Sequence, residues 1–254
     1  MMANQGIEYL DMQAYTGITK HIGGVRATDD LLALCHIETA REVLNVGCGI
    51  GVSSAYVAKK YGCHVVGVDI SEKMIEWSRR RARQEQVESR VDLRVGDILE
   101  LPFEPDRFDV VFVESVVVFV EDKARAIHEC VRVTRPGGYV GINESCWTEN
   151  PSPELKTLVN RDLGVDVPTV QAWRALWTAS GLQDQTAKIY QIDARKEVRD
   201  RLKWIGARWA LGAFGRLLYL YLTNPSARQS IKAFGGTGSD SIRSLAYGIF
   251  TGKK

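Results

Sequence analysis

The chain has 254 residues, 45% of them hydrophobic and 25% charged, and these values predict an ordinary globular protein. No uncharged apolar run reaches the roughly 18 residues that a membrane-spanning helix needs, and the first residues lack the basic and apolar regions of a secretory signal. The five cysteines are scattered without a Cys-x-x-Cys pair, so we expect buried thiols and a cytoplasmic, reducing location.

The net charge of +2 is unevenly distributed along the chain. From residue 195 onward, twelve Lys and Arg residues stand against three Asp and Glu residues, whereas the preceding part is acidic. A basic segment of this kind fits an anionic partner, such as a lipid surface or an acidic substrate, and fits a solvated basic face equally well. The acidic remainder, together with the lack of a nucleic-acid-binding motif, disfavours a nucleic-acid partner.

Short β-rich runs and helical stretches alternate over the first half of the chain. Their order predicts a parallel sheet with helices on both faces. In chain order, we expect a helix over Thr28–Ile37, a strand over Glu42–Val46, a helix from Gly51 to Tyr61, a strand over His64–Val68, a helix from the N-cap Ser71 to Gln86, strands over Arg90–Val95 and Phe108–Val113, a helix over Asp122–Arg135 and a strand over Tyr139–Asn143.

This alternation ends after Cys146. We expect an α/β fold with a doubly wound, mostly parallel sheet and a helical cap inserted before the last strand. The elements predicted in this second part are helices over Ser152–Leu163 and Val170–Ser180, a strand over Lys188–Ile192, a basic and apolar helical stretch over Arg195–Leu222 that Gly206, Gly212 and Gly215 interrupt, a short helix over Ser226–Phe234 and a last strand over Leu245–Thr251.

The first strand of the sheet runs directly into three glycines, Gly47, Gly49 and Gly51. Glycine lets the backbone approach a ligand where a Cβ atom would clash. The helix beyond Gly51 offers unpaired N–H groups and the positive end of its dipole. The pattern fits a nucleotide-type ligand with a carboxylate or phosphate, although a tight strand–helix turn alone gives the same spacing.

Two carboxylates follow at the ends of the next two strands. Asp69 comes twenty residues after Gly49, where it can accept hydrogen bonds from both ribose hydroxyls, and Ile70 beside it is assigned to the same ligand. Asp97 can accept from the exocyclic amino group of adenine, and Ile98 can pack on the ring. Taken singly, these aspartates also fit a helix N-cap and a turn. Because ligands of open α/β sheets bind at the carboxyl ends of the strands, the three elements together predict a binding site there.

These residues resemble the motifs of class I S-adenosylmethionine methyltransferases, the Rossmann-like type, over residues 20–145. The similarity is greatest to the small-molecule branch that includes the ubiquinone and menaquinone C-methyltransferases (methyltransferase type 11). Phe108-Asp109 and Arg135-Pro136-Gly137-Gly138 also fit this family. The resemblance implies an N-terminal cap and first helix (residues 1–40), a cofactor-binding Rossmann-like core (41–146) and a helical cap or substrate region with the last strands (147–254).

The resemblance also implies S-adenosylmethionine as the cofactor. Asn45 stands where the family usually has Asp, so it can hydrogen-bond to the cofactor without adding a negative charge. A nicotinamide dinucleotide is the main competitor, but Val52 stands where its Gly-x-Gly-x-x-Gly fingerprint has the last glycine. The family assigns the methionine portion to Gly47 and Gly49, the ribose to Asp69, and the adenine to Asp97 and Ile98.

The segment from Tyr15 to Gly24 combines aromatic, imidazole and glycine residues before the first predicted helix. In related methyltransferases a segment here folds over cofactor and substrate, which assigns Tyr15 to the cofactor; a lead-in with a glycine turn is the alternative. A hydroxyl or acidic carbon acceptor needs a base, and an amine must first lose a proton. The candidates are His21, Glu144 and Glu114, the last of which is also assigned to the cofactor, and the sequence does not choose among them.

The methyl acceptor is expected to bind the part of the chain after Cys146, where five of the six tryptophans lie. A basic helix with aromatic residues off its buried face either lies on a membrane or caps the active site. We predict methyl transfer to a small, lipophilic, quinone- or lipid-like acceptor, with peripheral membrane contact through the basic C-terminal helix as one interpretation. The alternatives are a small amine or polar acceptor, and a non-catalytic S-adenosylmethionine-binding module. Trp209 shares one helical face with Val198, Leu202 and Ile205 and is expected in the core, whereas Trp204 points elsewhere on that helix. The five tryptophans are Trp147, Trp173, Trp177, Trp204 and Trp209.

Overall fold

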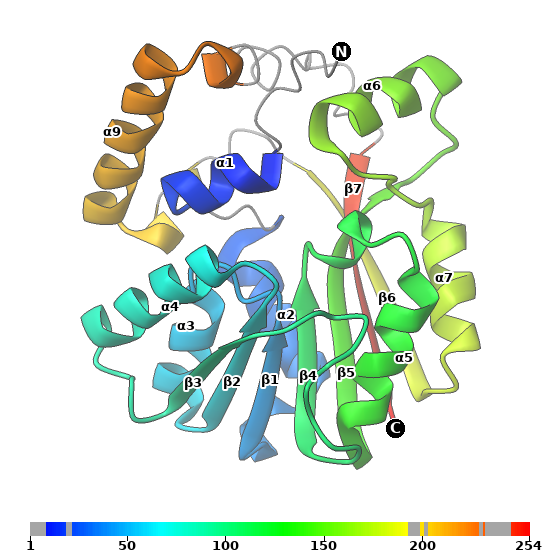
Figure 1. Cartoon of the computed structure of the whole chain (residues 1–254). Coiled ribbons are helices and arrows are strands. Elements are labelled where there is room, and N and C mark those ends of the chain that lie inside the picture. Colours follow the sequence, from blue (N-terminus) through cyan, green and yellow to red (C-terminus); the bar gives the residue numbers. More distant parts are fainter. Residues whose placement is uncertain (1–8, 19–21, 193–198, 201–202, 229–230, 232–244) are drawn as a thin grey trace.

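A computed structural model describes residues 9–18, 22–192, 199–200, 203–228, 231 and 245–254 (Figure 1). Its strands are β1 (Glu42–Val46), β2 (His64–Asp69), β3 (Val91–Val95), β4 (Phe108–Glu114), β5 (Thr134–Trp147), β6 (Gln183–Gln191) and β7 (Leu245–Lys253). Its helices are α1 (Tyr9–Thr16), α2 (Gly24–Leu34), α3 (Val52–Tyr61), α4 (Glu72–Gln84), α5 (Lys123–Val133), α6 (Pro153–Leu163), α7 (Val170–Ala179) and α9 (Ala207–Thr223), with 3-10 turns η1 (Ile37–Thr39) and η2 (Val117–Phe119).

Within the described residues, the strands form one seven-stranded sheet in the order β3-β2-β1-β4-β5-β7-β6. The strands from β3 to β5 pair in parallel, whereas β7 pairs antiparallel with β5 and with β6. The predicted doubly wound, mostly parallel α/β sheet is therefore confirmed. The order reverses between β1 and β4, and a crevice at such a reversal is the usual ligand site of open α/β sheets.

Helices cover both faces of the sheet because successive strand residues point to opposite sides. On β1, Val43 packs into a cluster with Leu31 of α2, whereas Leu44 packs into another cluster with Ile127 of α5 and Trp173 of α7. Each of these five side chains is at most 2% exposed. The carboxyl ends of the strands are consequently the free edge at which polar side chains can face a ligand.

The largest difference from the sequence prediction lies around β5. The helix before it ends at Val133 rather than Arg135, and the strand begins at Thr134, ahead of the Pro-Gly-Gly turn predicted there. The cause is pairing with β7, which is remote in sequence: Gly137 N–H donates to the Lys254 carbonyl oxygen (2.8 Å), and Lys254 N–H donates to the Gly138 carbonyl oxygen (2.9 Å). The strand then continues to Trp147, one residue beyond the domain boundary that the sequence predicted.

The C-terminal part also differs in its boundaries. The strand predicted at 188–192 begins at Gln183. The predicted break at Gly206 is confirmed: residues 199–200 and 203–205 are helical, Gly206 has a φ of 86°, and α9 begins at Ala207. The two breaks predicted at Gly212 and Gly215 are wrong, because both lie within α9. Residues 195–198 and 201–202, like most of the predicted helix 226–234, lie outside the described residues. No helix in the described part of the chain is both long and apolar enough to cross a membrane.

The five cysteines are buried free thiols, as the sequence predicted. Burial raises the pKa of Cys35 and Cys146, so both stay protonated at neutral pH. The thiols therefore behave as small apolar side chains of the core.

Candidate active site

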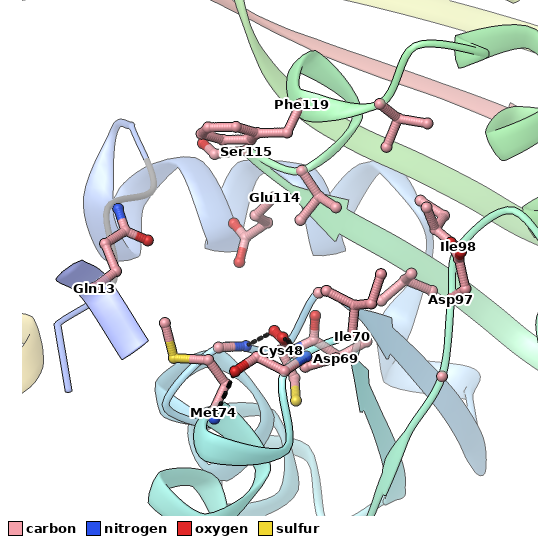
Figure 2. Close-up of a pocket in the computed structure, with 18 of the residues that line it drawn as sticks. Gln13, Cys48, Asp69, Ile70, Met74, Asp97, Ile98, Glu114, Ser115 and Phe119 are labelled. Carbon is pink, nitrogen blue, oxygen red and sulfur yellow. Dashed lines mark hydrogen bonds between the residues drawn. The ribbon is translucent and has the colours of Figure 1, made fainter. Parts of the chain in front are cut away.

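A cavity of about 370 Å³ opens at the carboxyl edge of the sheet (Figure 2). Its wall comes from the ends of β1, β2 and β4, the loop after β3, the η2 turn, α3, α4 and one residue of α1. This volume lies within the range of about 300–1,000 Å³ that is usual for small-molecule sites. Among the residues assigned to a cofactor from the sequence, those on the wall are Asn45, Gly47, Gly49, Asp69, Ile70, Asp97, Ile98 and Glu114.

Gly47 forms the turn that follows β1. It adopts a φ of +69°, and a Cβ atom at this position would lie 2.2 Å from Cγ2 of Val116 in the loop after β4. Its N–H donates to the carbonyl oxygen of Val68 at 2.7 Å, which ties the turn to β2. Glycine is thus required here by backbone conformation and by space, and its replacement would displace Val116 and the loop after β4 that lines the cavity.

Asp69 stands at the end of β2, with its carboxylate held by two backbone groups. Gly49 N–H donates to Oδ2 (2.9 Å) and Ser71 N–H donates to Oδ1 (3.0 Å). Burial raises the pKa of Asp69, and the two N–H donors oppose that rise. Since a carboxylate offers about four acceptor positions, two remain for donors from a ligand in the cavity. Asp69 taken alone also fitted a helix N-cap. The N-cap of α4 is instead Ser71, as predicted, and its side chain accepts from Met74 N–H.

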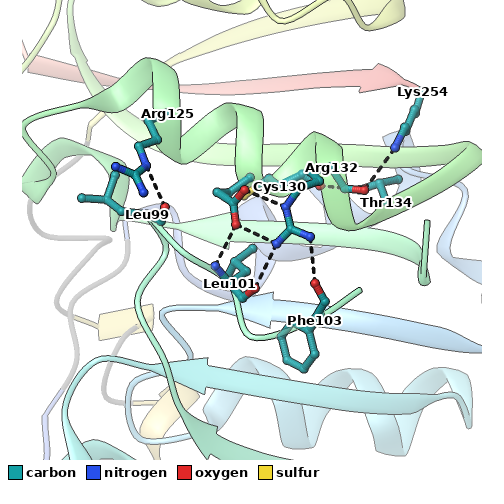
Figure 3. A network of polar contacts seen from close by, with 9 residues as sticks. Leu99, Leu101, Phe103, Arg125, Cys130, Arg132, Thr134 and Lys254 are labelled. Carbon is teal, nitrogen blue, oxygen red and sulfur yellow. Dashed lines mark hydrogen bonds and ion pairs between the residues drawn. The ribbon is translucent and has the colours of Figure 1, made fainter. Parts of the chain in front are cut away.

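Asp97 follows β3 in a loop that α5 fixes in place. Its Oδ1 accepts from Leu99 N–H at 2.9 Å, which forms the turn, and Ile98 is 7% exposed beside it. Figure 3 shows how the rest of the loop is held. Arg132 donates to the carbonyl oxygens of Leu101 (2.9 Å) and Phe103 (2.8 Å), and Arg125 donates to that of Leu99 (2.9 Å).

A carboxylate of α5 completes this arrangement. Glu129 Oε2 accepts from Leu101 N–H at 2.8 Å and pairs with Arg132, whose guanidinium holds the pKa of Glu129 below its usual value. The position of Asp97 at the cavity is therefore fixed by α5, about thirty residues further along the chain.

Glu114 ends β4 and points into the cavity opposite Asp69 (Figure 2). Thr28 Oγ1 donates to its Oε1 (2.8 Å), and Ser53 Oγ donates to its Oε2 (2.7 Å). The side chain is 8% exposed. The amide of Asn45, at the position where the resembling family has Asp, donates to Ser54 Oγ of α3 at 2.9 Å. On this side of the cavity, the negative charge therefore comes from β4 instead of β1.

The lining as a whole is acidic. Its carboxylates come from four separate elements, and the described lining residues include no Lys, Arg or His. Grouped carboxylates in a partly enclosed cavity attract cations and repel phosphates. The four are Asp69, Asp97, Glu114 and Glu121.

Glu144, a predicted candidate for the base, does not line the cavity. It is fully buried under the β4 loop, where its Oε1 accepts from the N–H groups of Val116 (2.8 Å) and Val117 (2.7 Å). Burial raises its pKa to about 7, against the lowering effect of these N–H donors. Glu144 thus positions the loop after β4, which lines the cavity. Because its side chain is buried, Glu144 does not face the cavity as a base for the acceptor would.

The sequence assigned Tyr15 and His21 of the N-terminal segment to the site. Tyr15 lies on α1 but not on the cavity wall, and it is 40% exposed. The α1 residue that reaches the wall is Gln13 (Figure 2), because residues two apart on a helix point about 200° apart. His21 lies outside the described residues.

Sequence reasoning did not identify several wall residues. No sequence pattern pointed to Gln13, since α1 has neither an N-cap residue nor an apolar stripe that would predict a helix. Phe119 and Val120 belong to the apolar run 116–120 that follows the predicted strand end, and this run could have indicated an apolar wall.

Four of the five tryptophans after Cys146 are buried in the core, and for Trp209 the sequence predicted this. Trp147, Trp173 and Trp177 are core residues with at most 2% exposure, and Trp209 packs under α1, where its Nε1 donates to the Gly17 carbonyl oxygen at 2.7 Å. None of these four lines the cavity.

This fold, with a glycine turn and an acidic pocket at the carboxyl edge of its sheet, is also found in solved methyltransferases. Residues 44–142 match the family described as Methyltransferase domain. A solved structure of an S-adenosylmethionine-dependent methyltransferase from Geobacter sulfurreducens, in complex with S-adenosyl-L-homocysteine, has the same fold. It shows a TM-score of 0.71 and 19% identity over 96% of this chain and 98% of that one.

Two curated relatives match at the sequence level. Phosphoethanolamine N-methyltransferase 1 of Arabidopsis thaliana is 29% identical over 167 residues, which cover 65% of this chain and 33% of the relative. Methyltransferase GfsG of Streptomyces halstedii is 34% identical over 119 residues, which cover 47% of this chain and 43% of the relative. The chain thus spans less than half the length of either relative.

Proposed function

We propose that this protein binds S-adenosylmethionine in the acidic cavity and transfers its methyl group to a small acceptor. The observation that carries the proposal is the lining, with four carboxylates and no Lys, Arg or His among its described residues. S-adenosylmethionine bears a sulfonium and an ammonium cation, whereas a dinucleotide would bring its pyrophosphate against these carboxylates.

The strand-end residues fit the nucleoside part of this cofactor. The free acceptor positions of Asp69 suit the two ribose hydroxyls, and Asp97 suits the amino group of adenine. Ile70, which is 68% exposed, and Ile98 supply apolar surface for the ring. Gly47 and Gly49 let the backbone approach the methionine portion closely.

Glu114 is proposed to bind the ammonium group of the methionine portion. Its two hydroxyl donors orient the carboxylate, and its charge replaces the one that Asn45 lacks. The carboxylate, oriented by Thr28 and Ser53, would form an ion pair with that ammonium group. Its second candidate role is that of the base that takes a proton from the acceptor.

S-adenosylmethionine supplies an electrophilic methyl group on a positively charged sulfur. The residues of this chain need only hold the acceptor in line with that methyl group and keep water out. Val116, Phe119 and Val120, from the loop after β4, give the cavity an apolar wall that can do both.

This apolar wall favours a neutral, lipophilic acceptor, of the quinone or lipid-like kind. The acidic lining disfavours an acceptor with a phosphate group, such as the one named for the Arabidopsis relative. A small amine remains the alternative, because Glu114 and Glu121 favour an ammonium group.

The test is release of S-adenosylhomocysteine with a panel of quinones, isoprenoids, hydroxylated lipids, amines and phosphomonoesters. We expect turnover with lipophilic members and none with phosphomonoesters. Cofactor binding without turnover across the whole panel would support a non-catalytic module. Absence of cofactor binding by calorimetry would overturn the proposal.

A further inference from the structure

Helix α9 carries an apolar stripe on the side that faces away from the protein. Leu211, Phe214, Leu218 and Leu222 follow one another at intervals of three and four residues and therefore share one helix face. They are 74%, 64%, 47% and 63% exposed. Large apolar side chains gathered in this way on a surface indicate an interaction site.

The opposite face of α9 is firmly packed, so the exposed stripe does not come from a detached helix. Trp209, Ala213 and Leu220 are at most 8% exposed. The Trp209 ring lies 5.5 Å from that of Trp77 in α4, measured between centroids, and Arg216 Nε donates to the Thr16 carbonyl oxygen at 2.8 Å. Figure 1 shows α9 at the edge of the molecule beside α1 and α4.

An arginine groove runs alongside the stripe, between α9 and α4. Its walls include Arg80, Arg208 and Arg216, with the rings of Trp77 and Trp209. The guanidinium carbons of Arg80 and Arg216 lie 4.8 and 4.5 Å from the centroid of the Trp77 ring. Within the described residues, these three arginines form no ion pair with a carboxylate. Burial lowers the pKa of Arg216, and the nearby positive charge of Arg80 lowers it further.

The joint occurrence of the two features points to a lipid bilayer. The 17 residues of α9 include no Asp or Glu. A helix with one apolar face and flanking arginines binds anionic membranes. Its apolar face enters the boundary of the acyl chains, and its arginines lie among the headgroups. A second copy of the chain on the same face would bring the two arginine sets together, and their repulsion opposes self-association.

We propose that the apolar stripe of α9 and the adjacent arginine groove form a docking surface for an anionic phospholipid bilayer. The surface lies beside α1, which carries Gln13 of the cavity wall, so docking brings the candidate active site close to the lipid phase. The inference stands independently of methyl transfer, since it concerns a different face of the protein.

The test is sedimentation of the full chain with phosphatidylcholine vesicles, with and without phosphatidylglycerol. We expect binding only to the anionic vesicles and its loss at high salt. The double variant Phe214→Ser/Leu218→Ser should bind at least tenfold more weakly, because it removes buried apolar area. Arg80→Gln/Arg208→Gln should lose about fivefold per arginine.

Arg174→Gln is the matched control, since Arg174 is an exposed arginine on α7, away from the groove. It should bind like the wild type. Calorimetric affinity for S-adenosylmethionine and the melting temperature report whether each variant is folded. Equal binding to neutral vesicles, no vesicle binding at low salt, or wild-type binding by both double variants would overturn the proposal.

Two further outcomes would assign the surface to another partner. A dimer in solution that Phe214→Ser/Leu218→Ser abolishes would replace the bilayer by a second copy of the chain. Stabilisation by inorganic phosphate without any vesicle binding would replace it by a soluble anion.

Discussion

The two walls of the cavity are built in different ways. The strand-end wall, which carries Asp69 and Asp97, is polar, and the N–H groups of Ser71 and Leu99, two residues further on, orient its carboxylates. The loop wall, which runs from residue 116 to residue 121, is mainly apolar, and the buried Glu144 holds it through two backbone N–H groups. Glu114, which ends β4 ahead of this loop, is oriented by Thr28 of α2, 86 residues earlier in the chain.

This difference separates two tasks. The polar wall suits the parts of S-adenosylmethionine that are the same in every methyl transfer. A loop can vary without disturbing the sheet, so the loop wall suits an acceptor that differs among proteins of one fold. Three substitutions test this division, and a fourth tests the burial of Glu144 beneath the loop wall.

The largest effect is expected from Asp69→Ala. Two charge-assisted hydrogen bonds to the ribose would be lost, at about 1.5–3 kcal/mol each, so affinity for S-adenosylmethionine should fall at least about 100-fold. Titration calorimetry measures this. Asp69→Asn keeps one acceptor oxygen and should lose less. Unchanged affinity of Asp69→Ala would break the assignment of the strand-end wall to the nucleoside.

Glu144→Gln should change how stability depends on pH. Burial raises the pKa of Glu144 from its usual 4.5 to about 7, so the folded state holds this proton more tightly than the unfolded state does. The free energy of unfolding should therefore fall as the pH rises from about 4.5 to about 7, by up to about 3 kcal/mol.

The glutamine variant should lack this loss, which urea unfolding at pH 5 and pH 8 will measure. Its stability relative to the wild type should be greater at pH 8 than at pH 5. Parallel pH profiles of the two proteins would show that Glu144 is ionised in the folded protein at both pH values, which would contradict its raised pKa.

A smaller effect is expected from Glu114→Gln. The carboxylate's charge would be removed while its shape is kept, so affinity for S-adenosylmethionine should fall about tenfold, or about 1.4 kcal/mol. 5′-Methylthioadenosine, which lacks the amino-acid group, serves as the matched ligand. It should bind Glu114→Gln and wild type equally, whereas Asp69→Ala should weaken both ligands. Equal losses for the two ligands would remove the ammonium role from Glu114.

The smallest effect is expected from Phe119→Ala. Loss of apolar surface from the loop wall should raise the KM of a lipophilic acceptor about fivefold, or about 1 kcal/mol, with cofactor affinity unchanged. Steady-state kinetics with both substrates varied will separate the two constants. A raised cofactor Kd with an unchanged acceptor KM would reverse the assignment of this wall.

The sequence identified the core of the fold because its signals are local. The apolar runs, the glycine turn after Val46 and the Ser71 cap each report a preference of a few neighbouring residues, and the sheet realises all of them. The same holds for the strand-end wall: once the strands are parallel, Asp69 and Asp97 must arrive at one edge.

What only the tertiary structure decided are the contacts between distant segments. Glu144 is buried under the loop and Glu114 faces the cavity, although the sequence placed both at the carboxyl end of a predicted strand. The pairing of β5 with β7 extended a strand through a Pro-Gly-Gly sequence. The orientation of α1 about its axis places Gln13, and not Tyr15, on the cavity wall. Local preference determined which elements form and which edge binds, whereas the free energy of packing determined which side chains of those elements face the cavity.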